Sequence, residues 1–206
     1  MARDEQATRR EGNEIEFSRI VAFSDGVFAI AITLLVLNLQ IPQHLSEAQV
    51  DDALWDQREN LVAFAISFAV IGRFWVVHHR FFSEVEAFDG RLMTLNLFYL
   101  AWIVLIPFSS EVLGDYGAAP PAVVLYSVNL AGVVLFGLLM AVRARRAGLT
   151  TIDDRSHRET RIRSAYIAGV FLLSIPLGFL VPHLAPYLWL VLLVDPTARI
   201  VSRGER

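Results

Sequence analysis

The sequence predicts an all-α integral membrane protein with six transmembrane helices per chain and with both termini in the cytosol. Three observations support this fold class. Hydrophobic residues make up 55% of the 206 residues and charged residues only 19%, a balance that is unusual for a soluble domain. The apolar residues form long stretches, and arginines cluster between alternate stretches. We therefore expect one membrane domain over residues 20–201, between cytosolic tails at 1–19 and 202–206.

The N-terminal tail is polar and lacks the apolar centre and cleavage site of a signal peptide. The first apolar stretch then runs from Ile20 to Ile41, with Asp25 as its charged residue. A helix needs about 20 apolar residues to cross roughly 30 Å of hydrocarbon, so this stretch predicts one span. Five further spans are expected at Leu61–Val77, Leu92–Val112, Ala122–Val142, Ala165–Val181 and Leu184–Val194. Pro107 and Pro176 lie inside spans and predict kinks there.

The arginines predict the orientation of the spans, because basic residues near span ends stay on the cytosolic side. With the N-terminus inside, the predicted inner segments hold Arg19, Arg80, Arg91, the seven arginines of 143–163, and Arg199, Arg203 and Arg206. Arg58 falls in an outer loop. The outer loops instead collect Glu47, Asp51, Asp52, Asp56, Glu59, Glu111 and Asp115. These acids either form a vestibule that concentrates cations or mark loops that merely lack arginine.

The composition excludes several kinds of chemistry. The chain has no cysteine, so disulfides and thiolate metal sites are excluded. All 18 basic residues are arginine, which excludes Schiff-base lysines and lysine-dependent phosphate loops. The adjacent His78 and His79 diverge by about 100° on a helix, which argues against a metal site. We expect no enzyme, no cofactor, no nucleic-acid partner and no soluble substrate.

A line of apolar residues follows the first span when successive residues are placed about 100° apart. The line contains Phe23, Val27, Ile30, Leu34, Leu37 and Ile41. Asp25 lies at roughly 200° from Phe23, so it faces its own bundle if this stripe faces a pore. Ordinary packing of an apolar helix produces the same stripe, and the periodicity alone leaves both interpretations open.

The start of the first span also carries a motif. Arg19, Phe23, Ser24 and Asp25 follow the pattern R-x-x-x-F-S-D, and this segment resembles the first-helix signature of the TMEM175 family of potassium channels. The similarity continues through Trp75–Arg80, Asp89, Asn96–Leu100 and Pro107-Phe108 and covers most of residues 15–117, whereas the second half is similar only in hydropathy and span count. The resemblance implies a prokaryotic single-repeat member: a homotetramer in which the first helix of each chain lines a central pore.

The resemblance places a hydrophobic constriction at Ile30, Leu34 and Leu37. No T-V-G-Y-G segment is present to form a carbonyl filter, so a preference for K⁺ over Na⁺ would reflect the lower dehydration cost of K⁺. Thr33 and Asn38 flank the stripe and could offer oxygens at its edge. The Thr33 hydroxyl could equally bond to the backbone of its own helix.

A buried polar network is expected at the inner end of the bundle. Asp25 lies about 8 Å inside the cytosolic boundary at about 1.5 Å per residue, where an unpaired carboxylate costs several kcal/mol. The neighbouring Ser24 is expected to join it, and matching depths on the next two spans predict the other members, which are Asn96 and either Arg73 or His78. Arg19 lies at the helix entrance. The network either holds the first helix in register, or responds to protonation of Asp25 or a histidine, or belongs to a proton pathway.

The sequence thus predicts a homotetrameric, potassium-preferring cation channel in the lipid bilayer of the cell membrane, with K⁺ as the permeant ion and a hydrophobic gate on the first helix. The alternative function is a proton-coupled secondary transporter that uses Asp25 and His78. A non-conducting membrane scaffold is a third class. The absence of paired broken helices in the sequence disfavours a transporter.

Overall fold

The computed structural model describes the backbone of residues 2–117 and 119–150 and of positions 162, 166–167, 169–171, 173–174, 176–181, 188 and 191, with side chains described from Glu16 onward. Its helices are α1 (Ala2–Leu34), the 3₁₀ turn η1 (Leu35–Asn38), α2 (Glu47–Asp56), α3 (Arg58–Ser83), α4 (Gly90–Val104), α5 (Ile106–Tyr116) and α6 (Pro120–Arg146). Most of the expected sixth span and the Arg-rich segment after residue 150 lie outside the described residues.

Within the described residues, four helical segments are long and apolar enough to cross a membrane: Glu16–Asn38, Arg58–Ser83, Gly90–Tyr116 and Pro120–Arg146. They coincide with the first four predicted spans. The described positions between Gly169 and Leu180 are also helical and lie in the predicted fifth span. The all-helical fold class is confirmed for the described residues.

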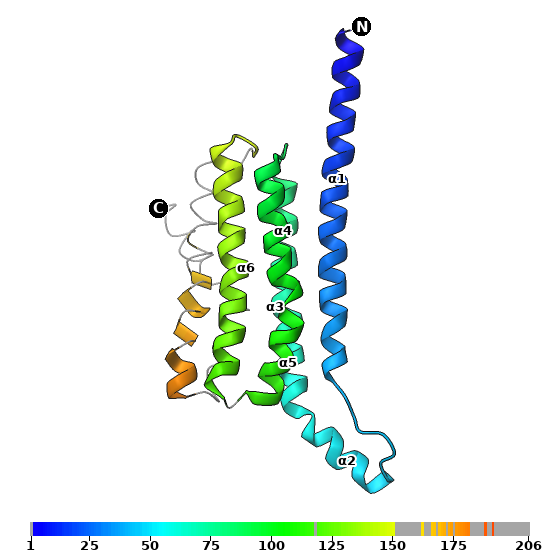
Figure 1. Ribbon diagram of the computed structural model, residues 1–206, viewed down its shortest axis with the longest axis vertical. Helices are drawn as coiled ribbons and strands as arrows, with labels where there is room; N and C mark the ends of the chain where they lie inside the picture. Colours follow the sequence, from blue (N-terminus) through cyan, green and yellow to red (C-terminus); the bar gives the residue numbers. More distant parts are fainter. Residues whose placement is uncertain are drawn as a thin grey trace, which may run out of the picture.

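The helices α3 to α6 stand side by side, and α1 runs along one side of them, where it contacts α3 and α4 (Figure 1). The N-terminal part of α1 extends past the end of the other helices (Figure 1). The sequence predicts only a polar tail there, whereas the structure continues the helix back to Ala2. The helix α2 likewise lies in a segment for which the sequence predicts only a loop.

The first span ends earlier than the apolar stretch predicts. The α-helix stops at Leu34 and tightens into η1, which ends at Asn38. Ile41 is therefore not helical; it precedes Pro42, and a residue before proline is disfavoured in the α conformation. The predicted 100° spacing consequently holds as far as Leu34, while Leu37 is positioned by a 3₁₀ turn.

The third span is broken at Leu105, between α4 and α5. Pro107 supplies no N–H group, so it cannot continue the hydrogen-bond ladder. Asn129 of α6 is buried beside the break. We assign its amide in the orientation that gives both groups a partner, with the nitrogen 3.0 Å from the carbonyl oxygen of Trp102 and the oxygen 3.1 Å from the backbone nitrogen of Ile106. The kink predicted from Pro107 is present, and a side chain from a neighbouring helix bonds to both of its halves.

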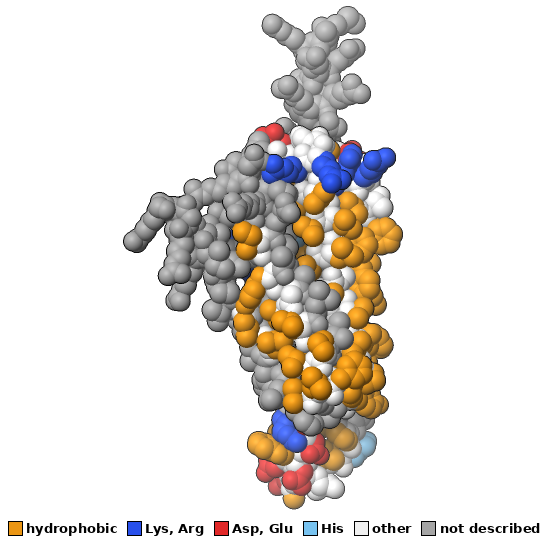
Figure 2. Space-filling view, turned by 90° about the vertical axis from the view of Figure 1, so that its left-hand side faces the viewer, with side chains coloured by type: hydrophobic (Ala, Val, Ile, Leu, Met, Phe, Trp, Pro, Cys, Tyr) orange, Lys and Arg blue, Asp and Glu red, His pale blue; other side chains and the backbone are white. Residues whose placement is uncertain are grey.

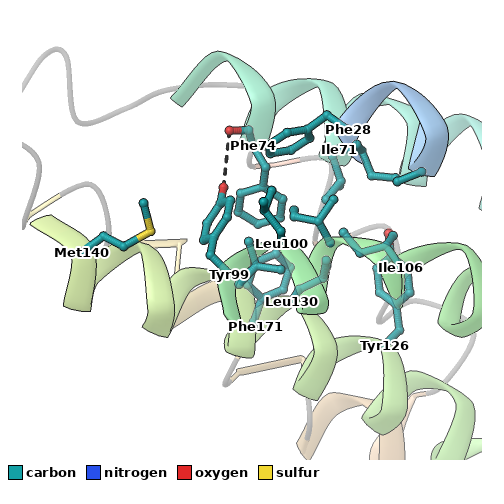
Figure 3. Close-up of a cluster of buried hydrophobic side chains, with 14 of the residues drawn as sticks. Phe28, Ile71, Phe74, Tyr99, Leu100, Ile106, Tyr126, Leu130, Met140 and Phe171 are labelled. Carbon is teal, nitrogen blue, oxygen red and sulfur yellow. Dashed lines mark hydrogen bonds between the residues drawn. The ribbon is translucent and has the colours of Figure 1, made fainter. Parts of the chain in front are cut away.

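One apolar cluster fills the space between the helices. Phe28 of α1 packs with Ile71 and Phe74 of α3, and the cluster continues through Tyr99 and other residues to α6 (Figure 3). The Tyr99 hydroxyl donates to the carbonyl oxygen of Phe74 at 3.4 Å. The core therefore joins α1 to the remaining helices, and the buried hydroxyl of Tyr99 has a hydrogen-bond partner within it.

The two ends of the bundle carry different charges. We call one end the arginine end; it carries Arg19, Arg80, Arg91, Arg143, Arg145 and Arg146. The opposite, acidic end carries Glu47, Asp51, Asp52, Asp56, Glu59, Glu111 and Asp115, with Arg58 among them. Figure 2 shows basic side chains with some acidic ones at one end, mainly acidic side chains with a basic patch at the other, and a broad hydrophobic band between them. Such a band flanked by charge is what a bilayer-spanning surface requires.

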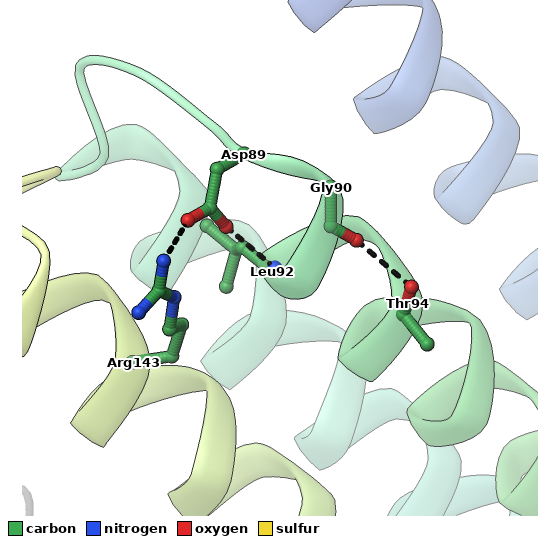
Figure 4. A network of polar contacts seen from close by, with 5 residues as sticks. All are labelled: Asp89, Gly90, Leu92, Thr94 and Arg143. Carbon is green, nitrogen blue, oxygen red and sulfur yellow. Dashed lines mark hydrogen bonds and ion pairs between the residues drawn. The ribbon is translucent and has the colours of Figure 1, made fainter.

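At the arginine end, the loop between α3 and α4 is held against α6. Asp89 caps α4 by accepting a hydrogen bond from the Leu92 backbone N–H at 2.8 Å, and its other oxygen pairs with Arg143 (Figure 4). The backbone N–H of Glu86 donates to the Leu149 carbonyl at 2.9 Å. The Arg143 guanidinium, followed by the Leu92 N–H, holds the pKa of the Asp89 carboxyl below its ordinary value.

Replacement of Gly132 by alanine is expected to lower the free energy of unfolding by about 1–3 kcal/mol, the usual cost of overpacking. An added Cβ would lie 2.4 Å from an atom of the Trp102 ring, which is too close. Gly72→Ala is the matched control, because a Cβ there meets nothing within 4 Å. Unfolding of the purified protein in mixed micelles measures both. Equal effects of the two substitutions would contradict the close approach of α6 to α4.

Asp89→Asn is expected to lower the free energy of unfolding at pH 7 by about 1 kcal/mol or less, because asparagine still caps α4 but loses the charge facing Arg143. The pKa of Asp89 is lowered in the folded state. Its ionised carboxylate therefore contributes fully to the free energy of unfolding above the ordinary value of 3.8, and this contribution disappears as the pH falls through the folded-state pKa. The difference between wild type and Asp89→Asn should therefore shrink at pH 3. Glu86→Gln, which removes the same charge from the same loop, controls for net charge, and an equal loss there would count against the ion pair.

Candidate functional site

The helix α1 has one buried face and one exposed face within the protomer. Ser24, Phe28, Ala31 and Leu35 are at most 1% exposed, and they recur at the three- and four-residue spacing of one helix face. On another face the exposed fractions are 56% for Phe23, 60% for Ile30, 37% for Leu34 and 60% for Leu37. The predicted stripe thus points away from the protomer's own core, except at Val27, which is half-buried.

The buried face of α1 is joined to α3 and α4 by a chain of hydrogen bonds. His78 of α3 donates from Nε2 to Oδ1 of Asn96 at 2.8 Å, because an amide oxygen can only accept. The Asn96 amide nitrogen then donates to Oγ of Ser24 at 3.0 Å, and the Ser24 hydroxyl donates to the Ile20 carbonyl at 2.9 Å. All three side chains are buried. These three hydrogen bonds run in one direction, from His78 to the backbone of α1.

Aromatic rings surround the histidine of this chain. The His78 ring lies 4.6 Å from the ring centroid of Phe82 and 5.3 Å from those of Phe28 and Tyr99. The polar chain is therefore enclosed by apolar groups rather than by water, which strengthens its hydrogen bonds and makes an unpaired member costly.

Asp25 lies beside this chain, with a different partner. Its Oδ1 accepts a hydrogen bond from the indole nitrogen of Trp75 at 2.9 Å, and the Trp75 ring stacks on His79 with centroids 5.6 Å apart. The sequence grouped Asp25 with Ser24, Asn96 and Arg73 or His78, and it did not identify the Trp75 partner. Trp75 lies between Arg73 and His78 on α3, so depth matching reached the right segment of the helix.

The remaining predicted residues are placed as follows. Arg19 is exposed at the arginine end, and Arg73 is half-buried on α3. The Thr33 hydroxyl donates to the Ile30 carbonyl of its own helix at 2.8 Å, which is the second of the two uses expected for it. The Asn38 side chain donates from Nδ2 to the Pro107 carbonyl at 3.0 Å and so joins the end of η1 to α5.

The described part of the chain contains no group of three or more His, Asp or Glu side chains that could hold a metal ion. His78 is buried in the hydrogen-bonded chain, while the neighbouring His79 is exposed. The two histidine rings therefore lie in different environments, one inside the bundle and one on its surface.

Comparison with known proteins identifies the relatives of this chain. The model of the family described as "Endosomal/lysosomal potassium channel TMEM175" matches residues 19–107. A Streptomyces collinus protein named a potassium channel is 36% identical over 171 residues, which cover 80% of this chain and 83% of that protein. A Gallus gallus protein named endosomal/lysosomal proton channel TMEM175 is 34% identical over 106 residues, which cover 48% of this chain but only 21% of that longer protein.

The fold matches a crystal structure described as a lysosomal potassium-selective channel TMEM175 homolog from Chamaesiphon minutus. The TM-score is 0.73 at 30% sequence identity, over 93% of this chain and 99% of the other. The fold thus defines an all-helical protein of the membrane-channel class. This chain belongs to the TMEM175 family. The resemblance of the first-helix motif is confirmed, and the similarity reaches beyond the first half of the chain.

Replacement of Asn96 by leucine, which has a similar shape, is expected to lower the free energy of unfolding by about 2 kcal/mol, because His78 and Ser24 lose a buried partner. Ser24→Ala combined with Asn96→Leu should cost less than the sum of the single substitutions, since both act on the same contact. Thr94→Ala on the same helix is the control, because the Thr94 hydroxyl donates to the Gly90 carbonyl of its own helix at 2.8 Å. Strict additivity of the two substitutions would contradict the chain.

Proposed function

We propose that this chain forms a homotetrameric, potassium-preferring cation channel of the cell membrane, in which the exposed face of α1 lines the pore. The observation that carries this proposal is the pair of faces on α1: one face is buried and hydrogen-bonded within the protomer, and the other exposes Phe23, Ile30, Leu34 and Leu37. The names of the relatives supply the function class. The exposed face of α1 indicates which residues would line the pore.

In this proposal, the side chains of Ile30, Leu34 and Leu37 from four copies form a hydrophobic constriction. An ion there loses part of its water shell and finds no replacement ligands, so conduction requires the constriction to widen and become wet. K⁺ loses water more easily than Na⁺, which gives a preference for K⁺ without a carbonyl filter. The hydroxyl of Thr33 already donates to its own helix, which leaves an oxygen lone pair as its contribution to the pore edge.

We assign a structural role to the chain of Ser24, Asn96 and His78. Hydrogen bonds are directional, and this chain joins three helices, so it sets the rotation of α1 about its own axis and hence the face that meets the pore. Current measured against cytosolic pH tests this assignment against a protonation-dependent role. A folded Asp25→Asn variant that has lost a wild-type pH response would favour the protonation-dependent role.

The arginine end is assigned to the cytosol, with both termini there. Arginines near span ends stay inside, and Arg19 of α1, Arg80 of α3, Arg91 of α4 and the three arginines that end α6 lie at this end, whereas Arg58 lies at the opposite one. Figure 2 shows basic side chains at this end. The acidic end then faces outward, where it raises the local concentration of cations near the pore.

A proton-coupled transporter that uses Asp25 and His78 is the alternative function, and related proteins in animals are named proton channels. Purified protein in liposomes separates these functions. A channel passes K⁺ down its gradient at rates that no carrier cycle reaches, whereas a transporter gives a saturable, substrate-dependent flux. A flux carried by protons alone would contradict the preference for K⁺.

Leu34→Ala is expected to raise the K⁺ flux at least about fivefold, which corresponds to lowering the barrier by about 1 kcal/mol, because it widens the proposed constriction. Single-channel recording in a bilayer with K⁺ and Na⁺ gradients measures the conductance and the selectivity together. Leu135→Ala is the matched control: this leucine is 52% exposed on α6, away from α1. Unchanged conductance of Leu34→Ala would place the gate elsewhere.

A further inference from the structure

The break in the third span lies in contact with the end of α1. In an unbroken α-helix, the backbone N–H of Ile106 would donate to the carbonyl of Trp102, four residues earlier. Instead, the carboxamide of Asn129 lies between the two groups, 3.1 Å from the first and 3.0 Å from the second. A side chain inserted in this way is a recognised cause of a helix break. Asn129 thus fixes the path of the chain into α5.

The start of α5, just after the break, also contacts η1. Pro107 follows the break directly, and its carbonyl oxygen accepts the hydrogen bond from Nδ2 of Asn38 at 3.0 Å. Asn38 is the last residue of η1, next to Leu37. A continuous set of contacts therefore runs from Asn129 of α6, through the break, to the residue beside Leu37.

The other hydrogen bond at Leu37 is local and exposed: its carbonyl oxygen accepts from Nε2 of Gln40 at 3.1 Å. The Leu37 side chain is 60% exposed in the protomer, and a 3₁₀ turn has weaker hydrogen-bond geometry than an α-helix. Within η1, Leu35 is the fully buried residue, and it anchors the turn two residues before Leu37. The hydrogen bond from Asn38 holds the other side of Leu37.

We propose that Asn38 and Asn129 are positioning residues for the gate: Asn129 holds the broken third span so that the Pro107 carbonyl meets Asn38, and this contact sets the orientation of Leu37. This inference rests on the proposed function, because it requires Leu37 to line the pore. It adds two residues outside the pore stripe whose effect on conduction passes through the third span.

The test uses the absence of cysteine from the chain, since Leu37→Cys then provides a single thiol. A positively charged methanethiosulfonate is applied to this variant in liposomes, and both the modification rate and the K⁺ flux are recorded. The same measurement is made on two double variants, in which Leu37→Cys is combined with Asn38→Ala or with Asn129→Leu. We expect each addition to raise the modification rate at least about fivefold, a change of about 1 kcal/mol in the accessible state, because η1 is released. Both additions together should do no more than the larger single one, since they act through one contact.

Two controls separate positioning from a general loss of stability. Ser127→Ala removes a buried hydrogen bond from α6, the 2.7 Å contact with Ser174, without touching the break. Thr94→Ala removes a contact internal to α4. Neither control should change the rate at Leu37→Cys, and equal acceleration by Ser127→Ala would overturn the inference.

The outcomes distinguish this inference from the proposed function. If modification of Leu37→Cys reduces the flux but neither Asn38→Ala nor Asn129→Leu changes its rate, the pore is retained and the positioning role is wrong. If modification leaves the flux unchanged in every background, the pore assignment is wrong and the inference fails with it. Should Asn129→Leu not fold, Asn38→Ala at the half-buried end of η1 decides the question alone.

Discussion

The rotation of α1 about its own axis is the constraint on which the rest of the site depends. In hydrocarbon, apolar packing gives little preference for one face of an apolar helix over another, because lipid is as apolar as leucine. A buried hydroxyl is different, since it must find a partner inside the protein. Ser24 finds one in Asn96, and Asn96 in turn satisfies His78. In our proposal, this requirement, rather than the apolar stripe, determines which residues α1 presents outward.

Two polar contacts hold the first span, Glu16–Asn38, near its two ends. Ser24 is bonded near the arginine end, and Asn38 is bonded to the Pro107 carbonyl 14 residues later, about 20 Å along a helix. The side chains between these points on the exposed face are mainly apolar, apart from Thr33, whose hydroxyl bonds to its own helix. A rigid rod fixed at two points cannot rotate freely, so the residues between them keep one orientation. A constriction built on that face therefore needs no polar group of its own to hold it.

Hydropathy and arginine placement predicted the four spans that the described residues show, because length and charge at the ends are properties of single segments. Depth matching also selected Asn96, and it left Arg73 and His78 as alternatives on the second span, since groups at similar depth on packed helices can meet. The Trp75 partner of Asp25 and the insertion of Asn129 were missed, because a single tryptophan or asparagine on an apolar helix forms no periodic pattern from which its partner could be predicted. The early end of α1 was missed as well: the apolar run continues to Ile41, and only Pro42 signals that the helix cannot.

The buried polar groups of this bundle also explain why it has one arrangement rather than many. Ser67 of α3 bonds to Ser110 of α5 at 2.8 Å and lies 2.9 Å from the Tyr126 hydroxyl of α6, and Asn129 bonds across the break between α4 and α5. Each contact joins different helices, and each is directional, whereas the apolar cluster around them could slide by a turn at small cost. Insertion into the bilayer therefore depends on the apolar residues, and the register of the helices depends on the polar ones. Replacing the pair Ser24 and Asn96, which joins α1 to α4, by apolar side chains of equal volume would therefore leave a protein that still enters the membrane but no longer fixes the rotation of α1.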